Sequence, residues 1–264
     1  MPIKLYDLVA QPGGRFFSPP CVRARLSLMT KGVEFEMVEV TYHDLRFIWK
    51  ERLGVEKATA PFIEREDGSL LMDSLEIAKW LDAEYPDRTN LFLPEAPLPV
   101  DVKSAEYLAA IEEYEAYDKN KFRRGDAELA SIVFGLFAPR FVRMFDAETA
   151  EYWTSEARMG EGVWKRLSSQ TPESDAKNLA ILKEGLADLS SKEFANGRLF
   201  LSSAAKPGMK DFLALSSYRL LRAASANLAA QTFESSEVGE WPKWLQRMNE
   251  LYPLPLYWER DPKE

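Results

Sequence analysis

The first forty residues alternate between a strand-like, a helix-like and a second strand-like segment, and this order constrains the fold most strongly. Residues 3–9 and 35–40 are short and mainly apolar, as strands of a small sheet are. Between them, residues 21–31 place Val22 and Leu26 at helical spacing. Two strands joined through a helix run parallel, so the chain should begin with a helix-covered sheet.

The next segments should extend this sheet. Residues 44–53 predict a second helix. Residues 58–65 and 69–72 predict two strands of a hairpin, because an acidic turn that contains glycine separates them. The helix that follows begins with Asp73, which suits an N-cap. The order is therefore strand, helix, strand, helix, strand, strand, helix.

Residues 87–99 are rich in proline and lack a periodic pattern, so we expect them to link two domains, residues 1–86 and residues 100–264. The clear periodicity of the second domain is helical, including a charged amphipathic stretch at 152–167. The sequence therefore predicts an α/β domain followed by an all-α domain. The aromatic and proline-rich residues 252–264 should lie against the body of the protein.

Composition narrows the function classes. The net charge is −8 and the pI about 5.1, which argues against nucleic acid as a partner, because phosphate binding needs a basic surface. The sequence shows no apolar run of the roughly 18 residues that a membrane span needs, and no signal-peptide pattern, so we expect a cytoplasmic protein. One histidine, His43, and one cysteine, Cys21, leave no basis for a metal site.

The segment before the first helix is the best candidate for chemistry. Ser18 is followed by Pro19 and Pro20, and both residue types favour the start of a helix. The Ser18 hydroxyl should therefore lie near free backbone N–H groups, where an anion such as a ligand thiolate is stabilised. The alternative is that Ser18 only caps the helix.

Three motifs in this order resemble those of the glutathione transferases. The first is Ser-Pro-Pro-Cys-Val-Arg-Ala-Arg at 18–25, the second Thr-Ala-Pro at 59–61, and the third Asp-Ser-Leu-Glu-Ile-Ala at 73–78. The resemblance covers nearly the whole chain, and within the family it is strongest to the fungal FuA class. It implies a thioredoxin-like first domain and a helical second domain that holds the acceptor pocket.

The resemblance also implies roles for single residues. Ser18 would be the catalytic serine, which donates a hydrogen bond to the thiolate of glutathione, the co-substrate. The glutathione-binding residues would be Thr59, Ala60, Pro61, Asp73 and Ser74, with Pro61 following a cis peptide bond. Phe16 and Phe17 adjoin Ser18 and are candidates for the acceptor pocket.

The chain departs from the family pattern in three places. An Asp-Ser pair stands at 73–74 where Glu-Ser is usual, and Ala60 stands where valine is usual. Gly208 stands three residues before Asp211, where a serine or threonine usually caps the late helix. The last change removes one half of a reciprocal cap and bears on stability.

These observations leave three functions open. The first is a glutathione transferase that attacks an aromatic electrophile or a β-aryl ether of the kind derived from lignin, with peroxidase activity as a side reaction. Such a role would serve detoxification or the metabolism of lignin-derived compounds. The second is a ligandin-type protein that binds aromatic polyphenols without catalysis. The third is a thiol-disulfide reductase that uses Cys21, since cysteines at helix N-termini can be redox-active.

The resemblance also implies a homodimer. The expected contact joins residues 67–83 of one copy to residues 102–117 of the other. Tyr107, Tyr114 and Tyr117 would supply aromatic area to that interface.

Overall fold

The computed structural model describes residues 2–121 and 127–253 of the 264-residue chain, so the end of the predicted tail lies outside the described residues. Four strands form one sheet in the order β2-β1-β3-β4. Their bounds are β1 Ile3–Leu8, β2 Phe35–Val40, β3 Phe62–Glu64 and β4 Leu70–Met72. The first two strands are parallel and the other pairs antiparallel, which confirms the order of elements expected from the sequence.

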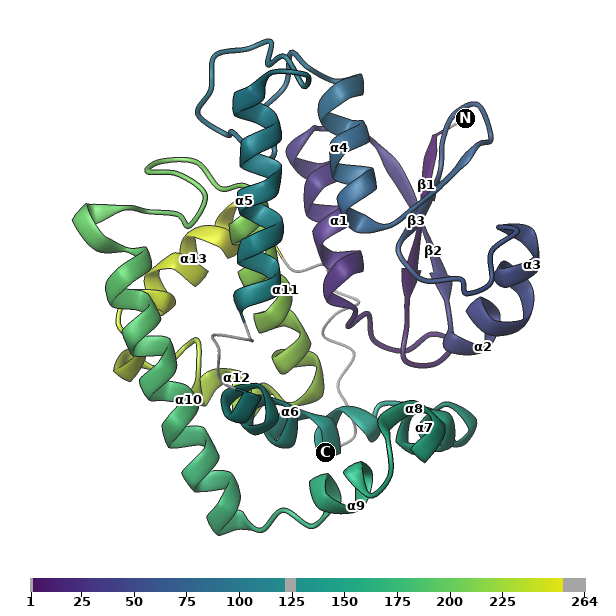
Figure 1. The fold of residues 1–264 in the computed structure, drawn as a ribbon, viewed down its shortest axis with the longest axis vertical. Coiled ribbons are helices and arrows are strands. Elements are labelled where there is room, and N and C mark those ends of the chain that lie inside the picture. Colours follow the sequence, from purple (N-terminus) through teal and green to yellow (C-terminus); the bar gives the residue numbers. More distant parts are fainter. Residues whose placement is uncertain (1, 122–126, 254–264) are drawn as a thin grey trace.

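Helices cover the sheet on one face, and a helical segment covers the other (Figure 1). Helices α1 (Pro19–Thr30) and α4 (Ser74–Glu84) lie between the sheet and the helical part of the chain. The opposite face meets a continuous run of α2 (Tyr42–Asp44), a π-helical turn (Leu45–Trp49) and α3 (Lys50–Arg52). There the Tyr6 ring of β1 lies against the Trp49 and Phe62 rings.

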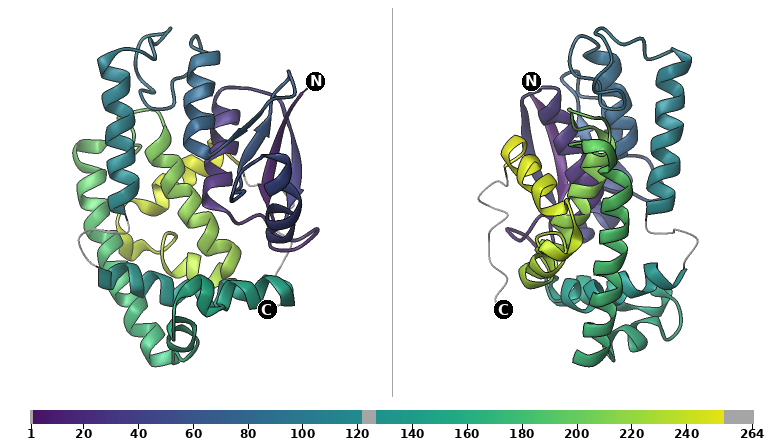
Figure 2. Two further views of the ribbon diagram at one scale, coloured as in Figure 1. Left: turned by 45° about the vertical axis from the view of Figure 1, so that its right-hand side comes forward. Right: turned by 90° about the vertical axis from the view of Figure 1, so that its left-hand side faces the viewer.

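The rest of the described chain is helical, as expected. Its longest helices are α5 (Ala105–Lys121), α6 (Ala127–Val142), α10 (Pro172–Glu193), α11 (Met209–Ala224) and α13 (Trp241–Leu251). Shorter helices are α7 (Ala147–Thr154), α8 (Glu156–Met159), α9 (Val163–Ser168), α12 (Ala226–Gln231) and the 3-10 turns Ala195–Gly197 and Ser236–Val238. The two views of Figure 2 place α10 on the side of this part that faces away from the sheet. The expected fold, a thioredoxin-like domain followed by an all-α region, is confirmed.

One helix predicted from periodicity is divided in the structure. The amphipathic stretch at 152–167 forms parts of α7, α8 and α9 instead of a single helix. Ser155 leaves the helical conformation, and Gly160 has a φ of 95°, which an L side chain rarely adopts. The helical spacing of apolar residues continues across Ser155 and Gly160, so the sequence pattern did not predict these two helix ends.

The two parts of the chain share one hydrophobic core. Leu26 and Leu28 of α1 belong to the same buried cluster as Phe212 and Leu215 of α11. The Arg15 guanidinium also donates a 2.7 Å hydrogen bond to the Ala223 carbonyl, which joins the loop before α1 to the end of α11. The loop that carries Ser18 is therefore anchored to the helical part. No helix of the described residues is long and apolar enough to cross a membrane.

Candidate functional site

Ser18 occupies the N-cap position of α1, where the sequence places it. Its backbone is extended and its carbonyl accepts a 3.0 Å hydrogen bond from the Val22 N–H. Its side chain makes no capping hydrogen bond. The two prolines that follow have no backbone N–H, so neither of them offers a donor for such a bond. The hydroxyl instead lies close enough to Cys21, one turn along the helix, to lower the pKa of that thiol slightly against the larger effect of burial. The hydroxyl is therefore not committed to holding the helix end.

A buried polar cluster lies beneath this serine. Cys21 is fully buried near the carboxylate of Asp7, which pairs with the Arg25 guanidinium. Burial, and then the charge of Asp7, raises the pKa of the Cys21 thiol well above its ordinary value. Because the thiolate is the reactive form, this environment makes Cys21 a poor nucleophile and weighs against the reductase function.

The Thr59–Pro61 loop and the start of α4 are neighbours. The Ala60–Pro61 peptide bond is cis, as the resemblance implies, and the Pro61 carbonyl accepts a 3.2 Å hydrogen bond from the Asp73 N–H. Thr59 is exposed, and its N–H points to the Met72 sulfur at 3.5 Å. The hairpin of β3 and β4 therefore brings two of the three motifs side by side.

Asp73 caps α4 in an unusual backbone conformation. Its φ is 84°, which is rare for a residue other than glycine and costs on the order of 1–3 kcal/mol. Its Oδ1 accepts hydrogen bonds from the N–H groups of Leu75 (2.7 Å) and Glu76 (3.3 Å). Both bonds end on Oδ1, so Oδ2 carries no bond from the helix. The exposed carboxylate can hold the helix and a ligand cation together.

Arg23 joins the serine motif to this pair, a role that the sequence did not suggest. Its Nη2 donates a 3.4 Å hydrogen bond to the hydroxyl of Ser74, which is buried. Its Nε is buried and lacks a hydrogen-bond partner in the structure. Because the contact depends on how α1 packs against α4, the spacing along the chain could not reveal it.

A buried tyrosine marks the place where three charged side chains gather. Burial raises the pKa of Tyr114 on α5 to about 12, with smaller effects from Arg23, Asp118 and Asp73. These groups come from α1, α5 and the start of α4. Charged groups of the first and third motifs therefore lie near enough to Tyr114 to affect its pKa.

Phe16 and Phe17 are buried instead of lining an open pocket. The Phe16 ring packs under the Arg25 guanidinium, whose central carbon lies 5.3 Å from the ring centroid. The Phe17 ring makes edge contacts with Phe141 (4.9 Å between centroids) and Phe145 (5.7 Å). Neither ring lines the cavity described next, so their part in acceptor binding stays a prediction.

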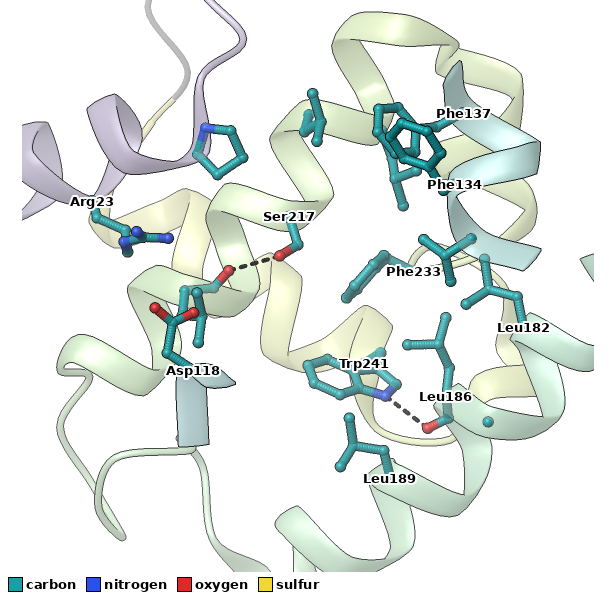
Figure 3. A pocket seen from close by; sticks show the side chains of 16 residues that line it. Arg23, Asp118, Phe134, Phe137, Leu182, Leu186, Leu189, Ser217, Phe233 and Trp241 are labelled. Atoms are coloured by element: carbon teal, nitrogen blue, oxygen red, sulfur yellow. Dashed lines mark hydrogen bonds between the residues drawn. The ribbon is translucent and has the colours of Figure 1, made fainter. Parts of the chain in front are cut away.

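A cavity of about 340 Å³ begins beside the first turn of α1 and extends into the helical part (Figure 3). Arg23 of α1 and Asp118 of α5 lie at one end, and Pro19 of α1 also lines the cavity. The remaining lining residues are apolar apart from Ser217 and Gly185: Val133, Phe134, Phe137, Leu182, Leu186, Leu189, Leu213, Leu220, Leu221, Phe233 and Trp241. Such a cavity, apolar with a few polar groups at one end, is typical of a small-molecule site.

Comparison with known proteins finds a family model that matches residues 14–89 and solved structures with a similar fold over nearly the whole chain. Residues 14–89 match the family described as glutathione S-transferase, N-terminal domain. The structure is similar to glutathione transferase GSTFuA3 of Phanerochaete chrysosporium, with a TM-score of 0.69, 24% identity, and 97% of this chain and 99% of that chain covered. A Ceriporiopsis subvermispora glutathione S-transferase in complex with glutathione matches with a TM-score of 0.70, 20% identity, and 95% and 99% of the two chains covered.

Proposed function

Because residues 14–89 form a glutathione S-transferase N-terminal domain in a chain with the glutathione transferase fold, we propose that this protein is a glutathione transferase. The Ser18 hydroxyl would donate a hydrogen bond to the glutathione sulfur and so favour the thiolate over the thiol. The observation that carries this proposal is the position of Ser18 at the N-terminus of a 12-residue helix, with a hydroxyl that does not cap it.

The energies are sufficient for such a role. A free thiol has a pKa of about 8.5, and each unit of depression needs about 1.4 kcal/mol of preference for the thiolate. A helix N-terminus supplies roughly 0.3–1 kcal/mol, and a hydrogen bond to a charged acceptor roughly 1.5–3 kcal/mol. The helix alone is insufficient for a shift of two units, whereas helix and hydroxyl together are enough.

The Ser18 hydroxyl has one proton and can donate to one strong acceptor at a time. Its neighbour Cys21 is a neutral thiol whose pKa is raised by burial. A charged sulfur is the stronger acceptor, since charge-assisted hydrogen bonds are about twice as strong as neutral ones. The hydroxyl would therefore donate to a bound thiolate in preference to Cys21.

The other motif residues would bind the peptide part of glutathione. Asp73, through the carboxylate oxygen that the helix leaves unused, and Ser74 would bind the charged glutamyl end. Thr59, Ala60 and Pro61 would contribute backbone groups beside them, as an edge strand does to an added strand. The contact between Arg23 and Ser74 would hold this end close to the first turn of α1.

The reaction we propose is a displacement at carbon. The glutathione thiolate supplies the nucleophilic electron pair, a carbon–sulfur bond forms, and the bond to the leaving group breaks. For a β-aryl ether that bond is carbon–oxygen, and the aryl oxide leaves with the electron pair and takes a proton from solvent. Aromatic electrophiles and lignin-derived ethers are the acceptor classes to test first.

Replacement of Ser18 tests the mechanism. Ser18→Ala should lower kcat/KM at neutral pH by about 10- to 100-fold, because it removes a hydrogen bond to a charged group. The glutathione Kd, measured by calorimetry at a pH below the lowered pKa of the bound thiol, should change less than about threefold, because the hydroxyl favours only the ionised form. The turnover deficit should shrink as pH rises, when glutathione ionises without help.

Ser225→Ala is the matched control for loss of a serine cap. Ser225 is the N-cap of α12, its side chain accepts a 3.2 Å hydrogen bond from the Leu228 N–H, and it does not line the cavity beside α1. This variant should keep full turnover. If Ser18→Ala also kept full turnover and an unchanged pH profile, Ser18 would be a structural residue and the proposed mechanism would be wrong.

The apolar cavity favours a second candidate, a ligandin-type binding protein. A cavity of about 340 Å³ lined mainly by Leu and Phe can hold an aromatic molecule whether or not Ser18 acts on glutathione. The two functions differ in product. A binder would retain aromatic polyphenols at micromolar affinity and give no glutathione conjugate by mass spectrometry, whereas a transferase would give the conjugate.

A further inference from the structure

The cavity beside α1 divides sharply into an apolar body and a polar end. Figure 3 shows Phe134, Phe137 and Leu182 at one end, with Arg23 and Asp118 at the other. The apolar end is lined by side chains of α6 and α10, and the charged side chains of the cavity lie at the α1 end. We therefore expect a ligand to bind with its apolar part among the Leu and Phe side chains and its polar group beside Arg23 and Asp118.

The polar end of the cavity carries one cationic side chain, Arg23, and one anionic side chain, Asp118. Ser217 lines the middle of the cavity, but its hydroxyl donates a 2.9 Å hydrogen bond to the Leu213 carbonyl and so has no proton to give a ligand. The Arg23 guanidinium offers hydrogen-bond donors from α1. Asp118 offers a carboxylate from the opposite wall.

This pairing discriminates by charge. A ligand carboxylate placed at this end would be attracted by Arg23 but repelled by Asp118, and the reverse holds for an ammonium group. Beside the apolar lining of the cavity such repulsion is stronger than in bulk water, because the local dielectric is lower. A hydroxyl group satisfies both residues, since it can accept from the guanidinium and donate to the carboxylate.

We propose that this cavity binds uncharged, mainly apolar molecules that carry a hydroxyl group at one end, and that Asp118 excludes the corresponding acids. One consequence of this inference rests on the proposed function. Pro19 lines the cavity and follows Ser18 directly, so the hydroxyl end of a bound acceptor would lie next to the reacting glutathione sulfur. The selection itself requires no turnover.

Two probes of the same size test this selection. Biphenyl-4-methanol and biphenyl-4-carboxylate share one apolar body and differ in the charge of the end group. Calorimetry without glutathione at about pH 7.5 should show the alcohol binding at least about tenfold more tightly than the acid. Asp118→Asn should raise the affinity for the acid by about tenfold and change that for the alcohol by less than about threefold.

Two further variants locate the effect. Glu115→Gln removes a charge on the same helix, one turn before Asp118, from a residue that pairs with Lys119 and does not line the cavity; it should leave the affinity ratio unchanged. Val133→Trp should fill the cavity and weaken both probes by about tenfold or more. Circular dichroism confirms that each variant is folded.

Several outcomes would overturn the inference. It is wrong if the wild type binds neither probe, if it binds the acid as tightly as the alcohol, or if Asp118→Asn leaves the ratio unchanged. Unchanged binding in Val133→Trp would place the probes elsewhere. The affinity ratio should also persist in Ser18→Ala, so failure of the proposed catalytic role and failure of this selection give different results.

Discussion

The carbonyl oxygen of Leu91 lies where a side chain at position 208 would begin. An ideal Cβ built on Gly208 would be 2.7 Å from that oxygen and 3.0 Å from the Ser202 side chain. The same carbonyl accepts a 3.0 Å hydrogen bond from the Met209 N–H, the first of α11. The linker therefore caps α11 with a backbone group, and only glycine leaves room for it.

This geometry explains the missing cap residue noted in the sequence. Half of the reciprocal cap remains, since the Asp211 carboxylate accepts a 3.1 Å hydrogen bond from the Gly208 N–H. The absent hydroxyl is replaced by that of Ser202, which accepts a 3.1 Å bond from the Lys210 N–H. The departure thus keeps the cap and changes which residue supplies it.

Gly208→Ser should therefore destabilise the protein, although serine is a preferred N-cap residue. We expect a loss of about 1–3 kcal/mol in the free energy of unfolding, because the new Cβ must displace backbone. Urea unfolding followed by circular dichroism measures it. An increase in stability would mean that the loop moves freely away from position 208.

Ser202→Ala should cost about 1 kcal/mol, the usual loss when a capping hydroxyl is removed. The midpoint of thermal unfolding should fall, while glutathione turnover at a permissive temperature should not. Ser191→Ala is the control, because Ser191 is exposed and bonds only within its own helix, to the Asp188 carbonyl at 2.7 Å. Equal midpoints for the two variants would contradict the role assigned to Ser202.

A buried ion pair should dominate the stability of the first domain. Lys31 and Asp82 lie 2.7 Å apart with both side chains fully buried, and Asp82 also accepts hydrogen bonds from the Leu91 N–H and the Tyr107 hydroxyl. Asp82→Ala should cost about 3–5 kcal/mol, because it leaves a buried ammonium without its counter-charge. Urea unfolding checks this value.

The exposed pair of Lys192 and Asp188 provides the comparison for that measurement. Its atoms are 2.8 Å apart, the same kind of contact, but both side chains are about half exposed or more. Asp188→Ala should cost less than about 1 kcal/mol, as solvent-exposed pairs do. A similar loss for Asp82→Ala would show that the buried pair is not structurally important.

The sequence predicted what depends on local order and missed what depends on packing. Pro61 and Asp73 lie side by side because a hairpin joins them, and a hairpin can be read from the sequence. The contact between Arg23 and Ser74 depends on the angle at which α1 crosses α4, which residue spacing does not encode. The place of Asp118 in the cavity likewise depends on how α5 packs against its neighbours.

The expected role of two tyrosines in the dimer interface is wrong for a related reason. Tyr107 and Tyr114 are 2% and 4% exposed within a single chain, and they form one buried stripe with Ile111. The spacing of these residues along α5 is that of a core face, so their aromatic area belongs to the fold. Tyr117 is half-buried and packs against the same core.

Cys21 should resist alkylation in the native protein. Burial and the charge of Asp7 raise the pKa of its thiol, so the reactive thiolate stays scarce at about pH 8, where a free cysteine would be partly ionised. Mass spectrometry after treatment with iodoacetamide should show an unmodified native chain and a fully modified chain in urea. Equal rates in both states would restore the reductase hypothesis.

The last prediction concerns the homodimer, which we still propose for residues 67–83 and 102–117. Because Tyr107 is buried, the large apolar side chain that remains exposed on this part of α5 is Leu108, which is 50% exposed. Light scattering at tens of micromolar protein should give twice the chain mass of 30.2 kDa. Leu108→Glu should shift the equilibrium toward the single chain, because it places a charge in an apolar contact. A wild-type species of 30.2 kDa across that concentration range would rule the dimer out.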